Sequence, residues 1–305
     1  MRDFPSCFGE NGVQIADASS SSGTLLTPTT TTTTTTKNPQ NLVTCVYQCK
    51  LHSSSCFIIT INWTKNLMGQ GLSVQINNPT NQSLQTLEIK PNLFSKNRGL
   101  KTLETESNQI TIFWDLSRAK FGSSPEPIEK FYLAITINQE LILLLGDLEK
   151  ELYKKMNYSI SSSPCSVFVS KTEHVFGKKL YATTAQFCGK GQVHEILIEC
   201  DAIGGDDSVL LIRIDGKLVM QVKRLQWKFR GNYTILVDGL PVEVYWDVYS
   251  WFFGKLMGNA VFLFQTCLSA EKLWGSGQPG MGWSGHLGQV NGLGFSLVVF
   301  AWRNE

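Results

Sequence analysis

Two stretches of this sequence that lie 132 residues apart repeat the same order of residues, and this repetition constrains the fold most. ITIFWDLSRAKF (110–121) aligns with VEVYWDVYSWFF (242–253). The matched residues are Trp114 with Trp246, Asp115 with Asp247, Phe121 with Phe253, and Arg98–Gly99 with Arg230–Gly231. Alternation of apolar and polar residues could align any two β-rich stretches, but it does not explain paired Trp-Asp and Arg-Gly. The series therefore predicts a tandem duplication, and its spacing excludes propeller blades of ~40–45 residues.

Each half consists mostly of short runs rich in branched and aromatic residues, separated by Gly, Asn, Pro and Ser. Such runs are typical of antiparallel strands. Asp215-Gly216 and Asp238-Gly239 stand between runs and predict two-residue hairpin turns. Each copy has the size of a small sandwich or barrel. The sequence thus predicts a mainly β fold with two tandem duplicated antiparallel β-sandwich or barrel-like lobes and one or two short helices.

Only two segments are helical in pattern. DLEKELYKK (147–155) and SAEKLW (269–274) combine helix-forming residues with a polar start, and Asp147 and Ser269 would be their N-caps.

Composition divides the chain into four parts. A Ser/Thr-rich tract cannot bury enough apolar surface to offset its ordering entropy, so we expect a disordered leader. The predicted division is a leader at 1–40, a first β lobe at 41–155, a linker at 156–178, and a second β lobe at 179–305 with a Gly-rich loop at 275–294. That loop fits a flexible surface segment or a lid over a ligand.

The formal net charge of +2 gives no global field that would favour nucleic acid or membrane, so any basic site must be local. The N-terminal residues lack the apolar core of a signal peptide, and no apolar run has the length of a spanning helix. We expect an intracellular protein of the cytoplasm or nucleus, whose cysteines are reduced thiols.

The sequence contains no complete metal-binding or cofactor-binding motif. Cys49, His52 and Cys56 form C-x2-H-x3-C, which could bind zinc, but no paired C-x2-C knuckle accompanies them. Cys45 and Cys49 share the parity of core residues. GSGQPG (275–280) fits G-x-G-x-x-G by letter but not by context. We expect no metal and no cofactor.

The recurring acids Asp115 and Asp247 allow two interpretations. Paired carboxylates are candidates for general acid catalysis. An acid that recurs just after a strand more often accepts backbone N–H bonds in a capped turn, and this is the interpretation we favour.

The segment KRLQWKFR (223–230) holds four cations and two aromatic residues, and KPNLFSKNR (90–98) is its counterpart. Such segments bind anionic groups electrostatically and stack on bases or lipid headgroups. They also occur as strand edges whose cations prevent pairing with other chains. The candidate binding residues are Lys223, Arg224, Trp227, Lys228, Arg230, Lys90, Lys96 and Arg98.

Several long motifs resemble one plant family. They are MRDFPSCFGE, NLVTCVYQC, TINWTKNLMGQGLSVQI, FWDLSRAKF followed by FYLAI, and LIRIDGKLVMQVKRLQWKFRGN followed by VYWDV. The family is the plant domain of unknown function 868, and the resemblance covers nearly all of the chain outside the Thr tract. It implies a plant protein, and it transfers no catalytic or cofactor residue.

These observations predict a non-enzymatic interaction or regulatory protein whose partner is a protein or an anionic ligand. A hydrolase or transferase acting on a sugar or lipid between the lobes, and a peripheral phospholipid-binding module, are the alternatives. Trp114, Asp115, Phe121, Trp246, Asp247 and Phe253 would form a repeated framework packed inside each lobe. Tyr249, Trp251 and Phe252 are extra aromatic residues of the second copy, and we expect them to be buried against the rest of the fold.

Overall fold

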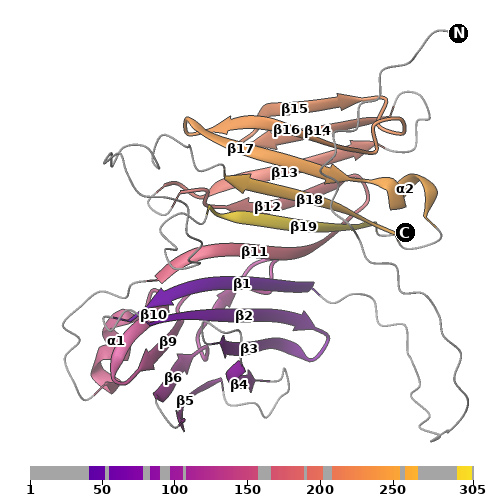
Figure 1. Ribbon diagram of the computed structural model, residues 1–305. Helices are drawn as coiled ribbons and strands as arrows, with labels where there is room; N and C mark the ends of the chain where they lie inside the picture. The colour runs from indigo at the N-terminus through magenta and orange to yellow at the C-terminus, as the bar shows by residue number, and fades with distance from the viewer. Residues whose placement is uncertain are drawn as a thin grey trace, which may run out of the picture. The chain divides into compact units, whose positions relative to one another are not determined.

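The computed structural model describes residues 41–51, 55–77, 83–89, 97–105, 108–156, 166–188, 191–201, 208–254, 258–266 and 294–303. Residues 38–305 form one compact unit, in which strands dominate (Figure 1). The predicted mainly β, sandwich-like fold is confirmed. The leader, the helix expected at 269–274 and the Gly-rich loop lie outside the described residues.

The first lobe packs two antiparallel four-stranded arrays against each other. The first array is β1 (Asn41–Lys50), β2 (Cys56–Asn66), β3 (Gly69–Asn77) and β4 (Ser83–Ile89). The second is β5 (Arg98–Glu104), β6 (Gln109–Asp115), β9 (Tyr132–Ile137) and β10 (Glu140–Gly146), and β7 (Lys120–Phe121) pairs separately with β8 (Pro127–Glu129). Every second residue of β2 is buried, because successive side chains point to opposite faces. The inward faces of both arrays form one apolar core.

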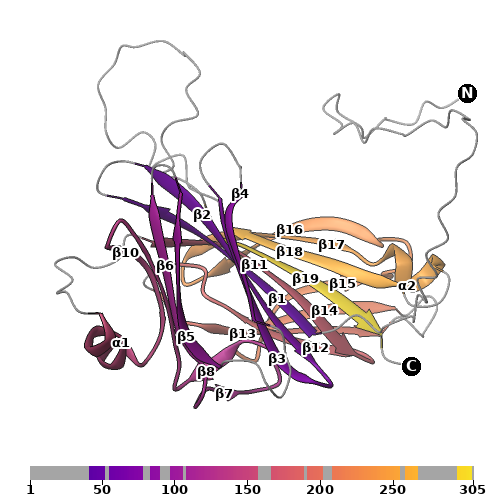
Figure 2. The same cartoon turned by 90° about the horizontal axis from the view of Figure 1, so that it is seen from below.

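A helix covers the outer face of the second array. All six residues of β9 are buried, because the core covers one face and α1 (Glu149–Lys155) covers the other. Figure 2 shows α1 on the side of this sheet that faces away from β1–β3. The predicted N-cap is wrong: Asp147 lies one residue too early, and its carboxylate accepts the N–H of Phe131 at 3.1 Å.

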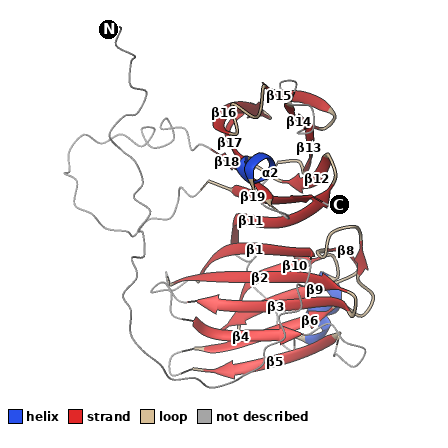
Figure 3. Ribbon diagram, turned by 90° about the vertical axis from the view of Figure 1, so that its right-hand side faces the viewer, coloured by secondary structure: helices blue, strands red, loops and turns tan. Residues whose placement is uncertain are grey.

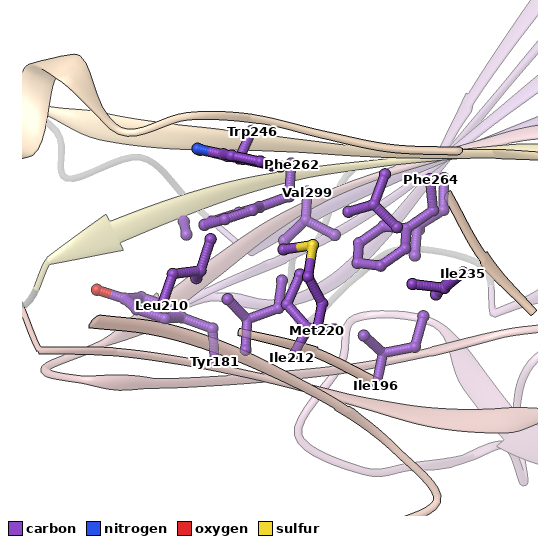
Figure 4. Packing of buried hydrophobic residues seen from close by; sticks show 14 of the residues in the cluster. Tyr181, Ile196, Leu210, Ile212, Met220, Ile235, Trp246, Phe262, Phe264 and Val299 are labelled. Carbon is purple, nitrogen blue, oxygen red and sulfur yellow. The ribbon is translucent and has the colours of Figure 1, made fainter. Parts of the chain in front are cut away.

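The second lobe also packs two four-stranded arrays against each other. One sheet contains β12 (Leu180–Ala185), β13 (His194–Asp201), β14 (Val209–Ile214) and β15 (Lys217–Lys223). Facing it are β16 (Arg230–Val237), β17 (Leu240–Asp247), β18 (Asn259–Thr266) and β19 (Ser296–Arg303), with α2 (Tyr249–Phe253) after β17 (Figure 3). Side chains of both sheets interdigitate in a core separate from that of the first lobe (Figure 4).

Strand β11 (Ser166–Gly177) joins the two lobes in one sheet. It pairs antiparallel with β1 and parallel with β19, which completes a nine-stranded sheet of order β16-β17-β18-β19-β11-β1-β2-β3-β4 (Figure 1). Half of the segment that the sequence marks as a linker is therefore the central strand of this sheet. Phe168 of β11 packs against both cores.

Both Asp-Gly pairs form the predicted hairpin turns. Asp215 and Gly216 connect β14 to β15, and Asp238 and Gly239 connect β16 to β17. All four residues have φ between 49° and 77°. Positive φ at both central positions matches the right-handed twist of paired strands, and Asp and Gly tolerate it better than other residues.

Candidate functional site

The matched residues of the two lobes occupy matching places in their hairpins. Gly99 pairs with Trp114 across β5 and β6, and Gly231 pairs with Trp246 across β16 and β17. A Cβ atom on Gly99 would lie 2.6 Å from Cζ2 of Trp114, and one on Gly231 would lie 2.3 Å from Cζ2 of Trp246. In each lobe the indole thus lies across the glycine, which leaves no room for a larger residue.

The two aspartates end their strands in the same way. Oδ1 of Asp115 accepts the N–H of Ser117 at 3.0 Å, and Oδ1 of Asp247 accepts the N–H of Tyr249 at 2.9 Å. A backbone bond spans each turn, from Leu116 N–H to Asn97 in the first lobe and from Val248 N–H to Phe229 in the second. Their carboxylates therefore hold a turn, which favours the structural interpretation.

The structure divides the extra aromatic residues of the second lobe. Trp251 is buried as expected. Its ring centroid lies 5.2 Å from the ring centroid of Tyr181 and 5.0 Å from the guanidinium carbon of Arg303. Phe252 is half-buried against the same core. The expectation is wrong for Tyr249 and also for Phe253, because α2 turns both rings outward. Phe121, the counterpart of Phe253, is half-buried in β7.

These outward rings join the predicted basic segment in a single surface. We call it the basic–aromatic surface, and it comprises Lys223, Arg224, Trp227, Lys228, Phe229, Arg230, Tyr249 and Phe253. Phe229 contacts the rings of Tyr249 and Phe253 at centroid distances of 5.4 and 5.7 Å, and those two rings lie 5.0 Å apart. Trp227, Phe253 and Tyr249 are 74%, 54% and 43% exposed.

Among the cations of this surface, Arg230 interacts with other residues of the surface itself. Its Nε donates to Oδ2 of Asp247 at 2.8 Å. Its guanidinium carbon also lies 5.3 Å from the ring centroid of Tyr249 and 5.7 Å from that of Phe229. In contrast, Lys223, Arg224 and Lys228 are exposed, and across the described ranges none of these three has an ion pair.

The underside of the segment is fixed to the core. Leu225 is fully buried, and its N–H donates to the carbonyl of Ser208 at 3.0 Å. Ser208 Oγ accepts the N–H of Gln226 at 3.1 Å, and Nε1 of Trp246 donates to the carbonyl of Lys228 at 2.9 Å. These bonds hold a turn in which Arg224 has φ of 55°. The surface is therefore preorganised.

The structure describes only the end of the first-lobe counterpart. Lys90 and Lys96 lie outside the described residues, and Arg98 is exposed at the start of β5. After β6, the cations of the turn are paired with carboxylates: Arg118 with Glu151 at 2.5 Å and Lys120 with Glu129 at 2.5 Å. Among the residues that the structure describes, a cationic aromatic surface is thus assembled in the second lobe.

Sequence reasoning missed a histidine held between two turns. Nδ1 of His194 lies 2.7 Å from Oδ2 of Asp215, and Nε2 lies 3.0 Å from Oδ2 of Asp238. The hydrogen bond to Asp215 raises the pKa of His194, burial opposes this shift, and Asp238 adds to it. The two ring nitrogens point to different carboxylates, so the three residues do not converge on one point. No group of metal-ligating side chains occurs in the part of the chain that the structure describes.

A buried charged cluster on β11 was also missed. The ammonium of Lys171 pairs with Glu173, lies 3.3 Å from Glu126 and donates to the carbonyl of Thr184 at 3.3 Å. Thr183 donates its hydroxyl to Glu173. Burial lowers the pKa of Lys171, but Glu173 and Glu126 outweigh burial and raise it above its ordinary value. The cluster holds β11 against β12 as a satisfied ion pair.

The cysteines of β1 are core residues, as expected. Cys45 and Cys49 are buried, and burial raises the pKa of the Cys45 thiol well above its usual range. Sγ of Cys56 accepts a hydrogen bond from Gln48 at 3.0 Å. His52 lies outside the described residues, so the C-x2-H-x3-C spacing is not tested.

Comparison with known proteins identifies the family. A model described as a plant protein of unknown function (DUF868) matches residues 38–303. The chain belongs to this family. No curated protein matches this DUF868 chain. A crystal structure of a protein of unknown function from Dyadobacter fermentans DSM 18053 shows 9% identity and a TM-score of 0.20, covering 74% of this chain and 91% of that one. Among the described residues of the DUF868 chain, no helix is long and apolar enough to cross a membrane.

Proposed function

We propose that this DUF868 protein is a non-enzymatic binding module, and that it binds an anionic ligand at the basic–aromatic surface of its second lobe. The observation that carries the proposal is the exposure of Lys223, Arg224 and Lys228 beside three solvent-exposed rings. Cations attract anionic groups, and exposed aromatic faces add stacking or apolar contact. Asp247, the carboxylate within this surface, is held by Arg230 and repels an anion less than a free acid would.

The hydrogen bonding of the recurring acids supports a binding role over catalysis. A general acid must reach a reacting group, whereas Asp115 and Asp247 are directed at their own backbone. The repeated framework also supports the tandem duplication, because Gly99 with Trp114 and Gly231 with Trp246 share one contact. On this proposal one ancestral lobe was copied, and the second copy gained the surface. Imaging of a fluorescent fusion tests the expected place in the cytoplasm or nucleus.

A charge-reversal experiment tests the binding proposal. The variant Lys223→Glu, Arg224→Glu, Lys228→Glu leaves Arg230 and its pair with Asp247 intact. We expect its retention on heparin and its binding to inositol hexakisphosphate to fall by more than about tenfold, with a lower salt dependence in both assays.

The matched control is Lys150→Glu with Lys154→Glu, which reverses exposed cations on α1 of the first lobe. Equal losses in the two variants would show a general charge effect. Unchanged binding in the triple variant would refute the proposal.

A further inference from the structure

The basic–aromatic surface combines two features that a soluble anion does not require together. On the basis of the proposed function, we propose that its ligand is the anionic surface of a lipid bilayer. Trp227 and Phe253 would enter the boundary between headgroups and acyl chains, and Lys223, Arg224 and Lys228 would contact the lipid phosphates.

The aromatic rings point to the interface of a bilayer. Trp227 exposes 74% of its surface and Phe253 exposes 54%, although the core of the same lobe buries other large rings almost fully. Trp and Tyr partition to the headgroup level because their rings are amphipathic, and Phe binds the apolar side of that level. The rings of Phe229, Tyr249 and Phe253 contact one another and form one aromatic cluster, and the exposed Trp227 stands two residues before Phe229 in the same segment.

The cations fit the negative potential of such a surface. Lys223 ends β15, Arg224 begins the turn, and Lys228 follows Trp227. Each Lys or Arg close to an anionic leaflet adds electrostatic attraction that falls off within a Debye length. Apolar burial and electrostatic attraction to anionic lipids add to each other at a bilayer, so a surface that offers both contacts binds more strongly than one that offers either alone.

The anchoring side chains are supported from beneath. Leu225 and Trp246 hold the turn of Trp227 to the core, and Trp251 fills the space under α2. Because this support already orders the turn and the helix, binding costs little conformational entropy. The turn and α2 therefore carry apolar side chains on two faces. Leu225 and Trp251 pack into the protein core, and Trp227 and Phe253 lie on the exposed face.

The first lobe supplies an internal comparison. Its turn after β6 shares the Trp-Asp framework, yet Ser117 stands where the second lobe has Tyr249, and Arg118 and Lys120 are neutralised by glutamates. At this described turn, the framework alone therefore does not produce exposed aromatic rings. Within the described residues, the rings that follow the Trp-Asp pair are a property of the second lobe, as those of a dedicated contact surface would be.

Vesicle flotation of the full chain tests this inference. The vesicles are phosphatidylcholine alone or equal parts phosphatidylcholine and phosphatidylserine, and heparin is the soluble polyanion. The variant Trp227→Ser, Phe253→Ser should bind the phosphatidylserine vesicles at least about tenfold more weakly, while its heparin retention, which depends mainly on the cations, should fall far less. Leu236→Ser is the control, because Leu236 is also exposed but lies about 20 Å along β16 from Arg230.

A second readout does not depend on the folding of the double variant. Vesicles with brominated acyl chains should quench the tryptophan fluorescence of the wild-type chain, and Trp227→Phe should remove most of that quenching. Absence of quenching in the wild-type chain would overturn the inference.

The outcomes separate this inference from the proposed function. If the aromatic variant floats like the wild type while the triple charge reversal loses heparin, the bilayer is excluded and anion binding stands. If the charge reversal changes neither heparin nor vesicle binding, both proposals fail. If the aromatic variant instead dissociates an oligomer in light scattering and keeps its vesicle binding, the surface is an interface between copies of this chain.

Discussion

Nδ1 of His194 lies 2.7 Å from Oδ2 of Asp215, and this contact links the start of β13 to the turn between β14 and β15. The other ring nitrogen contacts Asp238, in the turn of the opposite sheet. A protonated imidazole donates from both nitrogens, so only the charged form satisfies both carboxylates. His194 therefore connects the two sheets of the second lobe at one end.

The contact makes the stability of the second lobe depend on pH. The pKa of folded His194 is raised, so its stabilising contribution is complete below the unfolded value of about 6.5 and is lost as pH rises through the folded value. At acidic pH we expect the free energy of unfolding of the wild type to exceed that of His194→Gln by on the order of 1 kcal/mol. The difference is no larger because solvent screens the half-exposed carboxylates. Urea unfolding of both chains across the pH range measures this difference.

Asp238→Asn supplies the control, since it retains a hydrogen-bonding group without the charge. If the difference in unfolding free energy between the wild type and His194→Gln stays constant with pH, the protonated imidazole of His194 is not the source of the stabilisation.

Gly231 is required by the indole of Trp246. In Gly231→Ala the new methyl group would lie within 2.3 Å of Cζ2, so either the hairpin or the ring must move. We expect a loss of about 1–3 kcal/mol in the free energy of unfolding, as for other overpacked sites. Asn232→Ala, at the next, exposed position of β16, should cost much less. Combining Gly231→Ala with Trp246→Leu should cost less than the sum of the two changes, and strict additivity would argue against the contact.

Lys171 and Glu173 form a buried ion pair, and each side chain compensates the charge of the other. Lys171→Met leaves Glu173 buried beside Glu126, and we expect a loss of about 3–5 kcal/mol. The double variant Lys171→Met, Glu173→Leu should be more stable than the single variant, because it removes both charges. Guanidinium unfolding of the wild type, the single variant and the double variant measures these differences. A double variant less stable than the single variant would contradict the prediction.

Trp251 brings a buried donor into the core of the second lobe. Its Nε1 has no hydrogen-bond partner within the described structure. Trp251→Phe removes that donor and keeps most of the apolar area, so we expect a cost of no more than about 2 kcal/mol, against about 3–5 for Trp251→Ala. Thermal unfolding of both variants measures the difference, and equal costs would show that the ring itself contributes little.

The strands could be predicted because their signals are local. Residue alternation, as in β2, and the Asp-Gly pairs at 215–216 and 238–239 indicate strands and turns without knowledge of the rest of the chain. Strand β11 could not be predicted in the same way. It carries Lys171 and Glu173 on its buried face, and two charges at alternate positions indicate solvent unless their partners are known.

Only the basic segment of the candidate surface could be predicted, because the rest of the surface depends on contacts between distant parts of the chain. Lys223 to Arg230 stand out as a composition of cations and rings, but the addition of Tyr249 and Phe253 depends on how α2 leaves β17. His194 contacts Asp215 and Asp238 at sequence separations of 21 and 44, which no local pattern records.

The position of β11 between β1 and β19 has a consequence for synthesis on the ribosome. Ser170 of β11 and Ser296 of β19 are hydrogen-bonded across 126 residues, so one edge of β11 stays open until that much more chain has emerged. An open strand edge can pair with another nascent chain. Slow translation between these strands would therefore lower the yield of folded protein, even though no residue of the mature molecule had changed.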